Sequence, residues 1–177
     1  MNRALLFLLP CFLLSAPEAE EKAAAPGIAG LCVGMSRTVL LDTLSKSPAF
    51  KAAEIAIDSN AVMVSARGRE VLQSGKAAFS SVKCMFNKKK DVQALSFVFP
   101  AQTVDAVQAV YGLATEILGE PESVSGKKAG FGFEAEWRFS KYAATFFASD
   151  RDFEAYLLIA FKSFVREEEL RGKRHPQ

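Results

Sequence analysis

The chain has 177 residues, half of them apolar and 15 of them phenylalanine, and its 22 basic and 20 acidic side chains give a net charge of +2. This near-neutral balance argues against a nucleic-acid partner, because phosphate binding requires basic residues clustered on one face. The length and apolar content are sufficient for one hydrophobic core, so we expect a single domain.

Residues 1–19 have the organisation of a secretory signal peptide. Asn2 and Arg3 precede an apolar run from Ala4 to Leu14, and small residues follow as far as Ala19. This run of about eleven residues is too short to cross a hydrocarbon core of roughly 30 Å. We therefore expect cleavage between Ala16 and Ala19, a periplasmic or secreted protein, no transmembrane span and at most a loose association with the envelope.

The cysteines suggest two modifications. Leu8-Leu9-Pro10-Cys11 can be interpreted as a lipidation box, although Pro10 stands where a small residue is needed, so lipidation at Cys11 stays an alternative. Cys32 and Cys84 remain after signal removal, and an oxidising compartment favours joining them. Such a disulfide would close a loop of about 50 residues and stabilise the fold by roughly 4 kcal/mol in the chain-entropy model. The alternative is two buried thiols that never meet.

Residues 20–30 are small, charged and bounded by proline, which is typical of a disordered tether. The domain is expected over residues 31–165. Its first helix is predicted from Arg37 to Lys46, because Ser36 can cap its start and Pro48 prevents its continuation. Residues 50–76 are weakly patterned, with Ile55 and Ile57 on one side of a candidate strand.

The second half of the chain is more regular. Apolar alternation predicts a hairpin of strands at 82–86 and 95–99 around a turn at 87–90. Helical spacing then predicts a helix over Thr103–Leu118, which Gly119 and Pro121 end. The alternating run from Phe131 to Phe139 predicts a strand with one wet face, followed by strands at 142–148 and 153–161. Residues 166–177 form a charged tail.

These elements predict an α+β fold built as a two-layer sandwich. A helix followed by antiparallel strands occurs twice, which indicates two repeats that form one curved sheet backed by helices. The opening Leu31-Cys32-Val33-Gly34-Met35-Ser36 and the later Leu118-Gly119-Glu120-Pro121 and Trp137 resemble two families. These are the SmpA/OmlA-type lipoproteins of outer-membrane assembly and the repeats of β-lactamase-inhibitor protein. The resemblance implies a protein-binding module, with no activity attached to any single residue.

The residues offer little for catalysis. The single histidine, His175, lies three residues from the end, which argues against Ser-His-Asp and Cys-His chemistry. Two cysteines cannot complete a zinc site, so no metal, cofactor or catalytic residue is predicted. Glu134 and Glu136 share a strand face and could act as a carboxylate pair, but the ordinary wet face of a sheet explains them as well.

Surface recognition is therefore the leading hypothesis. The candidate protein-binding face comprises charged residues of one strand and tyrosines of the next two: Glu134, Glu136, Arg138, Tyr142 and Tyr156. We expect an exported, non-enzymatic protein-binding domain that serves envelope assembly or maintenance. An exported inhibitor of a hydrolase is the first alternative, and an undetected carboxylate-based enzyme is the second.

Overall fold

The computed structural model describes residues 27–51, 53–67, 71–74, 77–126 and 130–166. The predicted signal peptide, Cys11 and most of the predicted tether lie outside these residues, as does the tail after residue 166. Folded structure begins before the expected start at Leu31, because β1 (Gly27–Ile28) pairs with β2 (Leu31–Cys32). Ile28 is 4% exposed, so its burial attaches the end of the predicted tether to the core.

Helix α1 (Arg37–Lys46) has the predicted bounds. The Ser36 side chain accepts a hydrogen bond of 3.3 Å from the backbone N–H of Val39, which satisfies one of the free donors at the helix start. Leu40 and Leu44, four residues apart on one side of the helix, are both buried. The 3-10 helix η1 (Pro48–Phe50) follows, with proline at its first position.

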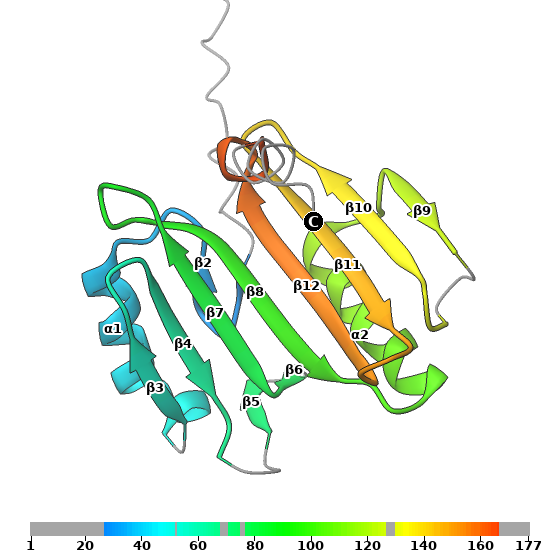
Figure 1. The fold of residues 1–177 in the computed structure, drawn as a ribbon, viewed down its shortest axis with the longest axis horizontal. Coiled ribbons are helices and arrows are strands. Elements are labelled where there is room, and N and C mark those ends of the chain that lie inside the picture. The colour runs from blue at the N-terminus through cyan, green and yellow to red at the C-terminus, as the bar shows by residue number, and fades with distance from the viewer. Residues whose placement is uncertain (1–26, 52, 68–70, 75–76, 127–129, 167–177) are drawn as a thin grey trace, which may run out of the picture.

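Eight strands form one antiparallel sheet in the order β3-β4-β7-β8-β12-β11-β10-β9 (Figure 1). Their bounds are β3 (Glu54–Ile57), β4 (Ala61–Ser65), β7 (Ser81–Phe86), β8 (Val92–Pro100), β9 (Ser123–Ser125), β10 (Glu134–Arg138), β11 (Tyr142–Ser149) and β12 (Glu154–Phe161). The predicted α+β class is confirmed at this level. Strands β8 and β12 pair at the middle of the sheet, where Leu95 lies opposite Ile159.

Strand β10 begins later than the predicted start at Phe131. Gly132 has a φ of +74°, a left-handed conformation that interrupts the extended chain before Glu134. Alternation of apolar residues alone did not reveal this break. Phe131 instead makes an edge-to-face contact with Phe153, with ring centroids 5.9 Å apart.

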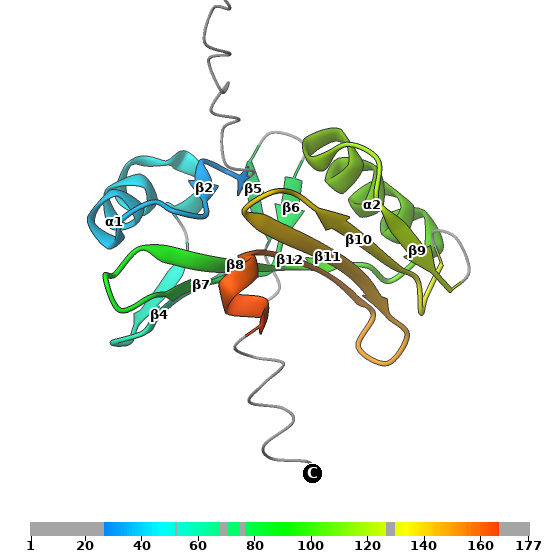
Figure 2. The ribbon, with the colours of Figure 1, turned by 90° about the horizontal axis from the view of Figure 1, so that it is seen from above.

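Helix α2 (Val104–Leu118) begins where predicted, because the Thr103 side chain accepts a 3.2 Å hydrogen bond from the N–H of Ala106. It ends at Gly119, whose φ is +80°. Figure 2 shows α1 and α2 on the same face of the sheet, so these two helices form one layer and the sheet forms the other. Residues 162–166 are also helical and lie on the opposite face.

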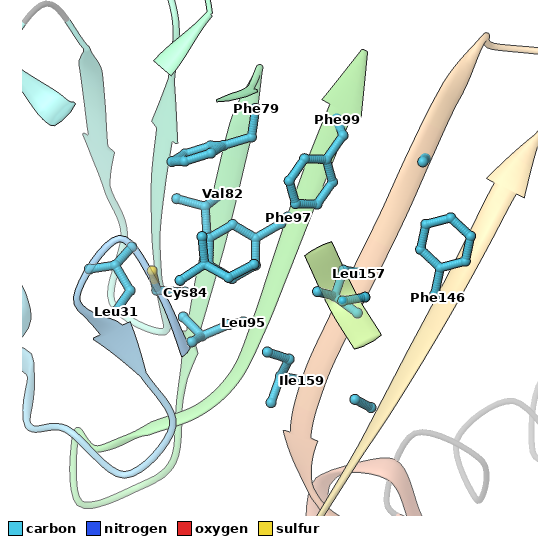
Figure 3. Packing of buried hydrophobic residues seen from close by; sticks show 14 of the residues in the cluster. Leu31, Phe79, Val82, Cys84, Leu95, Phe97, Phe99, Phe146, Leu157 and Ile159 are labelled. Carbon is cyan, nitrogen blue, oxygen red and sulfur yellow. The ribbon is translucent and has the colours of Figure 1, made fainter. Parts of the chain in front are cut away.

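The core fills the space between the helices and one face of the sheet. Side chains of β7, β8, β11 and β12 that point to this face include the labelled Val82, Leu95, Phe97, Phe146 and Leu157 of Figure 3, each with no exposed surface. A separate two-stranded ribbon, β5 (Leu72–Ser74) and β6 (Ala77–Phe79), was not anticipated. It places Phe79 against Phe97, with ring centroids 5.5 Å apart.

No helix in the described part of the chain is long and apolar enough to cross a membrane.

Candidate functional site

The open face of the sheet is the side opposite α1 and α2, and β10 shows how the sequence assigns side chains to it. Successive residues of a strand point to opposite faces. Ala135 and Trp137 are buried on the helix side, so Glu134, Glu136 and Arg138 point to the open face. The predicted orientation of these three residues is therefore observed.

The strand register brings an aromatic pair beside these charges. Glu134 lies opposite Phe147 of β11, Phe147 opposite Tyr156 of β12, and Tyr156 opposite Val98 of β8. Residues paired in this way share a face, so the four side chains form a row across the open face. Phe147 is 41% exposed, a large value for a phenylalanine inside an eight-stranded sheet. We call Glu134, Phe147, Tyr156 and Val98 the aromatic row.

Tyr142 lies outside this face, unlike in the prediction. The backbone N–H of Phe139 donates to the carbonyl oxygen of Tyr142, so the two residues are neighbours across the β10–β11 turn. Both residues alternate in phase with the side chains that point to the helix-covered face, and their ring centroids lie 4.7 Å apart. Strand β11 carries apolar residues on both sides, which is why its sequence alone did not reveal the face of Tyr142.

Glu136 is already engaged by neighbouring side chains. Its carboxylate receives a 3.0 Å contact from Arg138 Nη2 and a 3.4 Å hydrogen bond from the Ser123 hydroxyl. Arg138 also lies 3.7 Å from Glu122. Glu134, two residues earlier, makes no ion pair or side-chain hydrogen bond with any residue that the structure describes. The two glutamates of the suggested carboxylate pair therefore have different surroundings.

Tyr156 joins the aromatic row to a second group of carboxylates. Its hydroxyl donates to Glu154 Oε2 at 2.7 Å and approaches Asp152 Oδ2 at 3.5 Å. The hydrogen bond to Glu154, together with partial burial and the negative charges of both carboxylates, raises the pKa of Tyr156 to about 12. Ionisation of this phenol would place a third negative charge beside two others, so the hydroxyl remains a donor at neutral pH.

The opposite end of the open face is covered. Ala94 and Ala160 point to this side but have no exposed surface, and the helical residues 162–166 lie against the same side (Figure 2). Phe164 lines a hollow of about 990 Å³ together with Lys83 and Met85 of β7 and the β7–β8 turn residues Lys88 and Lys89. Asp58 and Asp91 line the same hollow, so the described charges are mixed at this end of the open face, whereas carboxylates lie around Tyr156.

The predicted Cys32–Cys84 disulfide is not formed in the structure, where both are free thiols. Leu31 and Val33 are buried in the core, so Cys32 between them points the other way. Cys84 has no exposed surface and points into the core from β7 (Figure 3), and burial raises its pKa to about 12. The two sulfur atoms therefore lie on different sides of β2.

Within the described ranges, no three His, Cys, Asp or Glu side chains are grouped as metal ligands. Sequence reasoning also gave no weight to Phe153, which is 53% exposed and has a φ of +54°. A bulky residue rarely adopts this conformation. Its only signal in the sequence is its place after Asp150-Arg151-Asp152, a run typical of a turn.

The chain was compared with protein-family models, with curated proteins and with solved structures, and none of the three comparisons gave a significant match.

Proposed function

We propose that the protein is a non-enzymatic binding domain that contacts a partner protein through the open face of its sheet. The observation that supports this proposal is the aromatic row, in which half-exposed rings lie beside carboxylates on a face that α1 and α2 leave uncovered. Aromatic residues beside charged ones are enriched in protein interfaces. A lone surface ring needs no explanation, whereas the strand register places Phe147 and Tyr156 at adjacent positions on this face.

The same proposal includes a duplicated architecture. Helix α1 is followed by β3, β4, β7 and β8, and α2 by β9 to β12, and the final strands of both sets pair at the sheet centre. This order supports two helix-then-strand repeats and the suggested likeness to SmpA/OmlA-type lipoproteins and β-lactamase-inhibitor protein. The resemblance to these two families implies protein binding, which agrees with the proposed function of the open face.

A photo-crosslinking experiment tests the binding face. Benzoylphenylalanine replaces Phe147 on the open face or, as the matched control, Val124, which is 55% exposed and points to the helix side of the edge strand β9. After irradiation of living cells, we expect a discrete cross-linked species with the probe at 147 and none at 124. Equal cross-linking at both sites, or none at 147, would contradict the proposal.

Export to the envelope is the second part of the proposal and needs its own test. The amino-terminal pattern of residues 1–19 supports it. After osmotic shock, we expect the chain in the periplasmic fraction with a new amino terminus between residues 17 and 20. A chain that keeps Met1 and stays with the cytosol would refute export without bearing on the binding face. An envelope protein cross-linked at 147 would support assembly or maintenance, whereas a single hydrolase would support the inhibitor alternative.

A further inference from the structure

The chemistry of the partner can be inferred from the charges around the aromatic row. Glu134 stands at one end of the row, and Glu154 and Asp152 lie beside the Tyr156 hydroxyl. None of these three carboxylates has an ion pair with a described residue, and the exposed Arg151 in the same turn makes none either. Among the residues that the structure describes, the carboxylates that border the row therefore have no paired cation.

Glu136 provides the comparison within the same strand. It faces the same side as Glu134, and the protein itself supplies its cation, Arg138, at 3.0 Å. Around Phe147 and Tyr156 the chain offers aromatic faces and carboxylates, and no described cation is paired with these carboxylates. A partner side chain that is both cationic and flat would satisfy both features, because guanidinium groups stack on rings and pair with carboxylates at once.

We infer that the open face docks a basic segment of a partner protein, whose arginine side chains lie over Phe147 and Tyr156 and pair with Glu134 and Glu154. This inference rests on the proposed function and names the chemistry of its partner. Complementary charge accelerates the encounter and selects against acidic partners.

The test uses two short peptides as probes, N-acetyl-Leu-Arg-Leu-Arg-amide and N-acetyl-Leu-Glu-Leu-Glu-amide, titrated into the isotope-labelled chain and followed by NMR. We expect the arginine peptide to shift the backbone amides of Glu134, Phe147 and Tyr156, and the glutamate peptide to leave them unchanged. The shifts should weaken as salt is added, because exposed charges are screened within about 10 Å at 0.1 M.

Matched variants separate local charge from net charge. The double variant E134Q/E154Q should weaken binding of the arginine peptide at least fivefold. The control D105N/E120Q removes the same charge from exposed positions at the two ends of α2 and should leave binding within twofold. Equal binding of both peptides, preference for the glutamate peptide, or an unaffected E134Q/E154Q variant would overturn the inference. A cross-link at 147 would still support a protein partner in those cases, so failure of the inference is distinguishable from failure of the proposed function.

Discussion

The indole Nε1 of Trp137 donates a 2.7 Å hydrogen bond to the carbonyl oxygen of Gly119. Trp137 is 2% exposed on the helix side of β10, and Gly119 ends α2. The bond satisfies a carbonyl that the end of a helix leaves without an intrahelical donor. One side chain thus attaches the end of the helix layer to the sheet layer, and the single tryptophan of the chain is a structural residue.

Replacing this tryptophan tests the attachment. We expect W137F to lower the free energy of unfolding by about 1–3 kcal/mol, because it removes the donor to Gly119 and leaves a cavity. Urea unfolding followed by circular dichroism measures the loss. V124A, at an exposed position, should change the free energy by less than about 0.5 kcal/mol. Equal effects of the two variants would contradict the structural assignment of Trp137.

Alanine substitutions at two glycines should change the stability of the fold in opposite directions. At Gly126, φ is +78° and an added Cβ would lie 2.2 Å from the carbonyl oxygen of Gly132, so G126A should destabilise the fold. At Gly112, within α2, a Cβ would meet nothing within 4 Å, and G112A should stabilise by up to about 1 kcal/mol. Thermal unfolding of both variants measures the difference, and a stabilised G126A would refute the turn geometry.

The thiols should differ in reactivity. The test uses a chain truncated to begin at Glu20, which lacks Cys11. In this chain the half-buried Cys32 should react with a thiol reagent under native conditions, whereas Cys84 should not. Burial and a pKa near 12 keep Cys84 protonated and inaccessible until the protein unfolds. Mass spectrometry after alkylation counts the modified sites. No modification even after unfolding without reductant, with a mass two hydrogens lower, would instead establish the Cys32–Cys84 disulfide.

Tyr156 should make stability fall at alkaline pH. Its pKa is raised from 10 to about 12, so the folded state holds the phenolic proton more tightly than the unfolded state. The tighter proton binding contributes to the free energy of unfolding. This contribution is complete below pH 10 and is lost as the pH rises from 10 toward 12. We expect E154Q to lower the pKa of Tyr156, because the hydrogen bond to Glu154 is the main cause of the shift. Ultraviolet titration of tyrosinate measures the pKa, with Y156F to assign the signal, and an unchanged pKa in E154Q would contradict this cause.

Local signals in the sequence were sufficient to predict α1 and α2. Ser36 and Thr103 cap them, and Pro48 and Gly119 mark their ends, so each boundary depends on one or two neighbouring residues. Pairing in the sheet depends on residues far apart in the chain. The contact between β8 and β12, and the β5–β6 ribbon in the weakly patterned stretch, therefore could not be deduced from local alternation.

The candidate protein-binding face could likewise be predicted only in part from local alternation. Glu134, Glu136 and Arg138 were assigned correctly because β10 has one buried and one exposed side. Tyr142 was not, because β11 carries apolar residues on both sides and only its register with β10 determines which ring faces outward. The same register identifies Phe147 rather than Phe146 as the exposed neighbour of Tyr156.

The central position of β12 has a consequence for biogenesis. This strand is the last of the sheet in the sequence, yet it lies between β8 and β11. Until it emerges from the ribosome, those two strands expose unpaired backbone edges, which are prone to wrong pairing. The nascent chain can thus complete this sheet only after β12 has been synthesised and released.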